Sequence, residues 1–145
     1  MTGRPERNSG ARTVARKLAL QALYRWQLNT CEWQDLMSEF ATDPDMARAD
    51  AGYFQALIAA ITASHAELDA ALAPLLDRSP ALLDPVEHAL LLIGSYELQH
   101  RPEVPFRVVI NEAVTLARRF GATDGHKFIN GVLDRAARLW RVEEH

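Results

Sequence analysis

Side chains that could act as catalysts or metal ligands occur in this sequence, but their spacing matches no known catalytic constellation. There is no Gly-rich phosphate loop, no HExxH or GxSxG motif, and no cluster of His and Cys with metal-ligand spacing. The histidines are spread over several expected elements, which favours surface or core-edge positions. The single cysteine, Cys31, fits a small semi-buried hydrophobe better than a nucleophile. The sequence therefore predicts a protein that is not an enzyme and that needs no metal or cofactor.

The first expected helix offers a different chemistry, because cations and an aromatic ring share its outer face. At about 100° per residue, Arg12, Arg16 and Lys17 project away from the apolar stripe. Tyr24 projects to the same side. Cations neutralise phosphates and a tyrosine ring can stack on an unpaired base, a combination typical of proteins that bind single-stranded RNA. The alternative is an ordinary solvated helix face with one chance tyrosine.

The net charge of −3 conceals a segregated pattern of charges. Residues 1–31 hold six basic side chains against one acidic, and residues 104–142 hold seven against three. The middle of the chain, residues 32–103, holds three basic side chains against thirteen acidic ones. If folding brings the two basic segments together, they form one positive surface on an acidic protein.

The elements that position these side chains are expected to be helices throughout, since no alternating strand pattern of useful length occurs. Helices are expected to begin near Thr13 and at Asp43-Pro44, with a short amphipathic piece between them. Three more follow over residues 85–100, 106–120 and about 124–141. Residues 77–84 indicate a joint between two helical halves. The predicted fold class is all-α, with about six to seven helices in two packed halves.

Two of these helices carry further information. The helix over residues 85–100 begins with a strong cap signal, Asp84-Pro85, and has too many apolar side chains for one stripe, so we expect it to be central. In the last helix, Arg138 and Arg141 are expected to face outward. Gly131 inside that helix costs about 1 kcal/mol relative to alanine and indicates a close helix crossing.

With 145 residues, the chain is about the size of one domain, which we expect to span residues 12–142. Residues 1–11 lack an apolar stripe and are expected to form a flexible basic arm. No apolar run looks long enough for a membrane span, and the charged start lacks the core of a signal peptide. A cytoplasmic protein that does not bind membranes is therefore expected.

Three segments together resemble the NusB family of bacterial transcription antitermination factors. They are ALQALYRWQL at residues 19–28, VPFRVVINEA at residues 104–113, and FGATDGHKFINGVLD at residues 120–134. The resemblance is specific and runs from about Arg12 to Trp140, with the segments in family order. One departure from the family pattern is Gly125, which stands where such proteins usually have serine.

The resemblance implies an RNA-binding adaptor that pairs with NusE, a small-subunit ribosomal protein, and binds the boxA element of nascent RNA. RNA polymerase would thereby stay processive on ribosomal RNA operons. By position, the RNA surface of the family would fall on the following residues: Arg7, Arg12, Arg16, Tyr24, Phe120, Asp124 and Phe128. Lys17 and Lys127, which are expected to face outward, complete the predicted RNA-binding set. For the NusE-facing surface, the resemblance suggests Glu87 and its neighbours, an acidic patch suited to a basic protein.

Several of these assignments have a structural alternative. Phe120 and Phe128 also fall on apolar stripes, so each could be a core residue, an RNA contact, or both at the edge of the core. Asp124 could accept a hydrogen bond from a base, but the favoured role is the N-cap of the last helix. For the whole protein, the alternative function is a helical protein-interaction module that does not bind RNA by itself.

Overall fold

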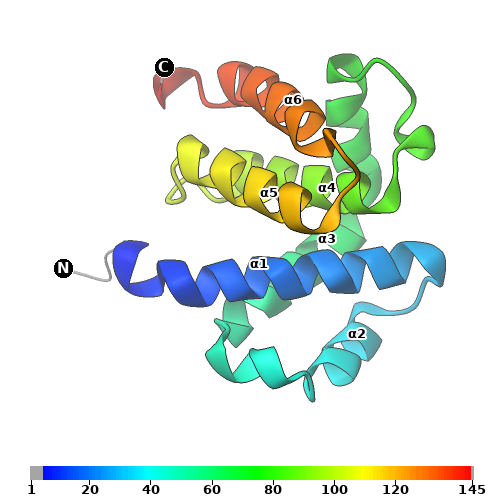
Figure 1. The fold of residues 1–145 in the computed structure, drawn as a ribbon, viewed down its shortest axis with the longest axis vertical. Helices are drawn as coiled ribbons and strands as arrows, with labels where there is room; N and C mark the ends of the chain where they lie inside the picture. Colours follow the sequence, from blue (N-terminus) through cyan, green and yellow to red (C-terminus); the bar gives the residue numbers. More distant parts are fainter. Residues whose placement is uncertain (1–4, 145) are drawn as a thin grey trace. The chain divides into compact units, whose positions relative to one another are not determined.

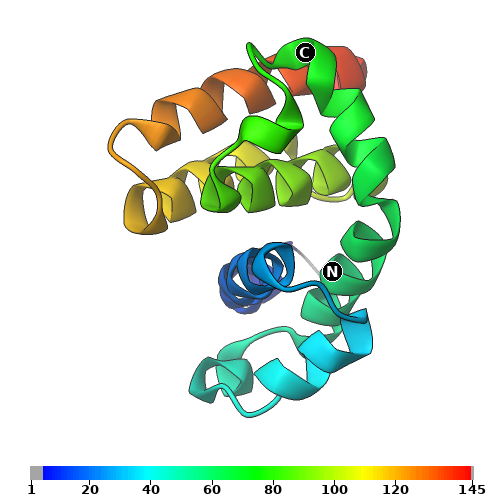
Figure 2. The ribbon, with the colours of Figure 1, turned by 90° about the vertical axis from the view of Figure 1, so that its right-hand side faces the viewer.

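The computed structural model describes the backbone of residues 5–144 and the side chains of residues 10–144, and it divides into two compact units. Unit 1 ends at Ala63 and unit 2 begins at Ser64. The boundary lies inside a long helix, α3 (Ala51–Leu72), where Ser64 has non-helical backbone angles, with φ −119° and ψ 17°. Figure 2 shows this helix from the side. The predicted joint at residues 77–84 is therefore wrong, because the division falls at the kink in α3.

Unit 1 contains α1 (Pro5–Leu28), α2 (Trp33–Phe40), the 3-10 helix η1 (Pro44–Arg48) and the first part of α3. Its apolar side chains recur at helical spacing and are buried, which stabilises the folded chain by about 1.5–3 kcal/mol for each large one. The fully buried large side chains of this unit are Leu18, Leu20, Leu23, Leu36, Phe54, Leu57, Ile58 and Ile61.

Two helix starts in unit 1 differ from the prediction. α1 begins at Pro5 rather than near Thr13, so most of the expected basic arm continues the helix. The mobility expected of residues 1–11 stays a prediction, and residues 1–4 lie outside the described residues. Asp43-Pro44 starts η1, where the Asp43 carboxylate accepts a hydrogen bond of 2.8 Å from the Asp45 N–H, and α3 starts only at Ala51.

Unit 2 is built around α4 (Pro85–His100), α5 (Phe106–Phe120) and α6 (Gly125–Trp140), which contact one another pairwise (Figure 1). Shorter 3-10 helices flank them, η2 (Ala73–Leu75) and η3 (Pro80–Leu82) before α4 and η4 (Val142–Glu144) after α6. The bounds of α4 and α5 are those predicted. In the part of the chain that the structure describes, every regular element is helical, which confirms the all-α fold in two helical halves.

The prediction that α4 is central is also confirmed. Every residue from Ala89 to Leu98 is buried. The Asp84 carboxylate caps the helix, accepting hydrogen bonds from the N–H groups of Val86 at 2.9 Å and Glu87 at 3.2 Å. These two bonds satisfy donors that the first turn of a helix leaves without a helical partner.

The close helix approach in unit 2 occurs at a different glycine from the one predicted. A Cβ atom added to Gly94 in α4 would lie 2.8 Å from Cδ2 of Leu133 in α6. The same atom added to Gly131 would meet only the Arg135 guanidinium, at an ordinary 3.5 Å. The interpretation of Gly131 is therefore wrong, and Gly94 is the residue whose missing side chain lets α4 and α6 pack closely.

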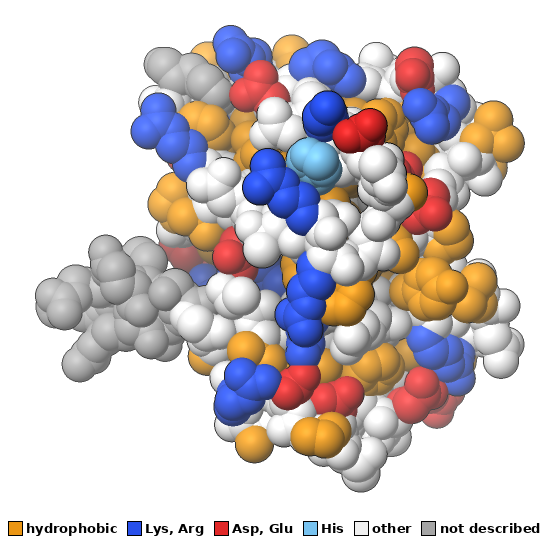
Figure 3. Space-filling model, viewed as in Figure 1, with side chains coloured by type: hydrophobic (Ala, Val, Ile, Leu, Met, Phe, Trp, Pro, Cys, Tyr) orange, Lys and Arg blue, Asp and Glu red, His pale blue; other side chains and the backbone are white. Residues whose placement is uncertain are grey.

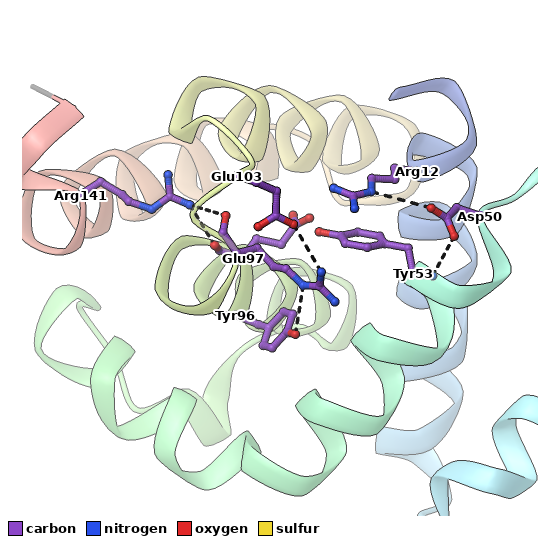
Figure 4. A network of polar contacts seen from close by, with 8 residues as sticks. Arg12, Asp50, Tyr53, Tyr96, Glu97, Glu103 and Arg141 are labelled. Carbon is purple, nitrogen blue, oxygen red and sulfur yellow. Dashed lines mark hydrogen bonds and ion pairs between the residues drawn. The ribbon is translucent and has the colours of Figure 1, made fainter. Parts of the chain in front are cut away.

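The C-terminal turn joins the ends of two helices through Arg141, which was expected to face outward but is only 7% exposed. Its guanidinium donates hydrogen bonds to the backbone oxygens of Leu98, Glu97 and Arg101, at 2.7, 3.0 and 2.9 Å. Figure 4 shows Arg141 directed toward Glu97. It also forms an ion pair with Glu144, whose other oxygen accepts a bond from the Phe106 N–H at 3.1 Å. Arg141 therefore caps α4 and is linked through Glu144 to the start of α5.

One helix, running from Ala51 to Leu75, is long and apolar enough to cross a membrane when judged only by length and composition. The expectation that no apolar run reaches that length is thus corrected. Its buried side chains, such as Phe54, Leu57 and Leu68, recur at the spacing of a helix that packs on a protein core. A core helix of a soluble protein passes the same test, so this feature is weak support for a membrane location.

Candidate RNA interface

Tyr24 presents an accessible ring on α1. Its side chain is 41% exposed, as the helical projection predicted, and it follows buried Leu23 along the helix. An exposed ring on a rigid helix can stack on an unpaired base with little loss of conformational freedom.

The arginines at the start of α1 lie over a second ring, that of Tyr53 in α3. The guanidinium carbons of Arg12 and Arg16 are 4.1 and 5.5 Å from the centre of this ring, which is itself buried. Arg12 also pairs with Asp50, with Nε 3.8 Å from Oδ2 (Figure 4). Arg16 is only 3% exposed, so the expectation that it projects into solvent is wrong. Through these cation–π contacts, Arg12 and Arg16, which belong to the predicted RNA surface, pack against a side chain of unit 1.

Lys17 is also engaged within unit 1. Its ammonium forms an ion pair with Asp45 of η1, and its side chain is 13% exposed. Hydrogen bonds from Lys17 and then from Arg48 lower the pKa of Asp45 below its ordinary value. The prediction that Lys17 faces outward is therefore wrong as well. Arg7 lies in α1, but its side chain lies outside the described residues.

The turn between α5 and α6 exposes both signs of charge. Asp124 has a left-handed backbone, with φ 67°, and its side chain is 66% exposed. It occupies the N-cap position of α6, but its carboxylate makes no cap hydrogen bond, which corrects the favoured capping role. Instead Oδ1 lies 3.4 Å from Nζ of Lys127, whose side chain is 72% exposed. Both charged groups are accessible to a ligand.

Phe120 and Phe128 flank this turn at the edge of the core. Both rings are half-buried, which agrees with the alternative of a double role. Each ring is covered by a guanidinium at 4.8 Å from its centre, that of Arg119 over Phe120 and that of Arg78 over Phe128. The turn therefore carries two ring and arginine stacks beside Asp124 and Lys127.

Glu87 does not form an open acidic patch, since it is 9% exposed. A Cβ atom on Gly125 would lie 2.8 Å from its Oε2, so the glycine gives the carboxylate room at the start of α6. Burial, and then the charge of Asp84, raise the pKa of Glu87, whereas Arg78 lowers it. The partner-binding role of Glu87 stays a prediction.

Several basic side chains of the described surface lie close to acidic ones. On the parts of both units visible in Figure 3, basic side chains lie beside acidic ones. Arg138 and Asp134 are a further example, with 3.1 Å between Nε and Oδ2. Among the described residues, no group of three or more His, Cys, Asp or Glu could hold a metal ion.

Sequence reasoning missed two residues of this site, Arg78 and Tyr53. Each lies far along the chain from the residues it contacts, Phe128 in one case and Arg12 and Arg16 in the other. No spacing rule within one helix could have found them. The predicted proximity of α1 to the turn between α5 and α6 involves both units and stays a prediction.

Comparison with known proteins assigns this helical chain to a class of transcription factors. The sequence model of the NusB family matches residues 13–138. Transcription antitermination protein NusB of Hahella chejuensis is 50% identical over 133 residues, covering 92% of this chain and 89% of the relative. The protein of the same name from Thiobacillus denitrificans is 46% identical over 136 residues, covering 94% of each.

A solved structure of T. maritima NusB agrees with this assignment. It matches with a TM-score of 0.75 and 27% identity, over 88% of this chain and 90% of that one. The chain belongs to the NusB family. Proteins of this transcription antitermination family are of a non-catalytic kind, and their role in transcription suggests a soluble protein.

Proposed function

We propose that this protein is a cytoplasmic antitermination adaptor that binds boxA RNA together with NusE and keeps RNA polymerase processive on ribosomal RNA operons. The observation that carries the proposal is the turn between α5 and α6, where Asp124 and Lys127 are exposed beside the half-buried rings of Phe120 and Phe128. Rings, a cation and an acceptor suited to a base amino group are the parts that recognition of unpaired RNA requires.

Tyr24 supplies the second part of the proposed RNA surface, from α1. Arg12 stays partly exposed, with 23% of its side chain accessible, and can add positive charge at this part of the surface. Arg16 and Lys17, which are largely buried, support α1 through Tyr53 and Asp45 rather than by direct contact with RNA. Because Arg16 and Lys17 add little accessible positive charge, the isolated protein should bind RNA weakly, and NusE should add affinity.

The NusE contact is proposed to include the start of α4, where Glu87 and Asp84 supply negative charge. Asp84 is exposed and Glu87 is buried, so a basic partner would meet Asp84 first. Charge complementarity of this kind chiefly sets the rate and specificity of association.

The second candidate function is a protein-interaction module that does not bind RNA by itself. The pairing of Lys17 with Asp45 and of Arg12 with Asp50 favours it, because these cations are partly neutralised within the protein. The two functions differ in their response to RNA sequence and to salt.

The test measures binding of labelled boxA RNA and of a scrambled RNA by fluorescence anisotropy, with and without NusE. We expect the pair to bind boxA RNA more tightly than either protein alone and to prefer it to the scrambled RNA. Affinity should fall with salt by about 0.7 log units per decade for each phosphate contact on a single strand. Equal affinity with and without NusE would contradict the adaptor function.

A further inference from the structure

The segment that runs from the end of η2 toward η3 contacts α6 at two points within unit 2. Arg135 of α6 donates a hydrogen bond of 3.0 Å from Nη2 to the backbone oxygen of Leu75. Three residues after Leu75, the guanidinium of Arg78 lies 4.8 Å from the centre of the ring of Phe128 in α6. A segment distant in sequence thus becomes part of the surface around the start of α6.

Arg78 is placed by a neighbouring carboxylate rather than by burial. Its Nε and Nη2 donate to the two oxygens of Asp77, at 2.7 and 3.2 Å, a bidentate arrangement that restrains the planar guanidinium. The Arg78 side chain is nevertheless 41% exposed. The guanidinium over Phe128 is therefore partly accessible to solvent.

We propose that Arg78 is part of the RNA-binding surface, where its guanidinium, stacked on Phe128, contacts an unpaired base or its phosphate. The inference rests on the proposed RNA-binding function and adds the segment between η2 and η3 to that surface. A guanidinium plane can stack on a base and donate hydrogen bonds to phosphate oxygens at the same time. Arg78 also supplies positive charge beside Asp77, whose carboxylate would otherwise repel a polyanion.

The test uses the full chain in complex with NusE and measures boxA RNA binding across a series of salt concentrations. Arg78→Gln removes the charge and the guanidinium plane but keeps a polar, though shorter, side chain. Arg138→Gln is the matched control, because Arg138 is also an exposed arginine paired with an aspartate in unit 2. Asp77→Asn removes the carboxylate that restrains Arg78 and leaves the cation in place.

We expect R78Q to weaken binding about 5-fold or more and to reduce the salt slope by about 0.7 log units per decade, as for the loss of one contact. R138Q should leave both values unchanged. D77N should keep or increase the affinity, because it removes a negative charge beside the RNA. Arg78→Lys should keep most of the salt slope, and it remains informative if R78Q folds poorly.

The outcomes separate this inference from the proposed function. If the wild-type complex does not bind boxA RNA, the proposed function fails and the inference fails with it. If the wild-type complex binds and R78Q behaves like R138Q, only the role of Arg78 is overturned. If R78Q and D77N weaken binding equally, Arg78 serves to hold the segment in place, which also overturns the inference.

Discussion

Replacing each of two glycines by alanine should separate packing from helix propensity. Gly94 and Gly131 lie inside helices of the same unit, so each substitution gains about 1 kcal/mol of helix propensity. A Cβ at Gly94 would lie 2.8 and 2.9 Å from the two Cδ atoms of Leu133, which is fully buried and must shift. Such overpacking costs about 1–3 kcal/mol, whereas a Cβ at Gly131 makes only an ordinary contact. G131A should therefore raise the free energy of unfolding, and G94A should lie about 1–3 kcal/mol below G131A.

The assay is urea unfolding followed by far-ultraviolet circular dichroism, with the wild type and both variants measured together. Because both substitutions fall in unit 2, a transition that involves that unit reports both of them. Leu133→Val in the G94A background should recover part of the loss, and the coupling between the two positions measures their contact. Equal effects of G94A and G131A, or a loss in G94A that Leu133→Val does not change, would refute the packing argument.

Three further predictions concern single side chains of unit 2. Arg141→Ala should lower the free energy of unfolding by about 3–5 kcal/mol, because it removes a buried cation from three backbone oxygens and from Glu144. Arg141→Lys should recover only part of this loss in urea unfolding, and full recovery would contradict the capping role. The pKa of Glu87 in the folded protein is raised above its ordinary value of 4.5. The native state therefore binds this proton more tightly than the unfolded state does. The stabilisation from the bound proton is lost as pH rises through the pKa of the folded state. Unfolding measured from about pH 4.5 upward should therefore show Glu87→Gln gaining stability relative to the wild type, and a difference independent of pH would contradict this. Asp124→Gly should raise the melting temperature and add about 1 kcal/mol of stability, since glycine adopts a positive φ without the strain of a Cβ, and a destabilised variant would be the contrary result.

The helical elements of unit 2 were predictable because their signals are local. Asp84-Pro85 places a cap and a fixed backbone angle at the start of α4, and the cap hydrogen bonds form as expected. Gly121 ends α5 where the apolar stripe ends. Propensity, periodicity and capping agree for α4, so its bounds follow from the sequence, whereas the predicted Asp124 cap of α6 does not form.

The site was less predictable because its contacts join segments distant in sequence. A helical projection places Arg16 and Lys17 on the outer face of α1. In the structure, Arg16 lies over the Tyr53 ring of α3 and Lys17 forms an ion pair with Asp45 of η1. Arg141 was expected to face outward for the same reason, whereas the carbonyl groups at the end of α4 hold it inside. The residue pattern of one helix does not show which other segments pack against that helix.

RNA binding by both units can be tested directly by photocrosslinking boxA RNA to the chain in its complex with NusE and identifying the crosslinked residues by mass spectrometry. We expect crosslinks from the same RNA strand both to α1, at Tyr24, and to the start of α6, at Phe128. Scrambled RNA should reduce both crosslinks together. Crosslinks to only one of these helices, or to neither, would contradict the proposal that α1 and the start of α6 both contact unpaired RNA.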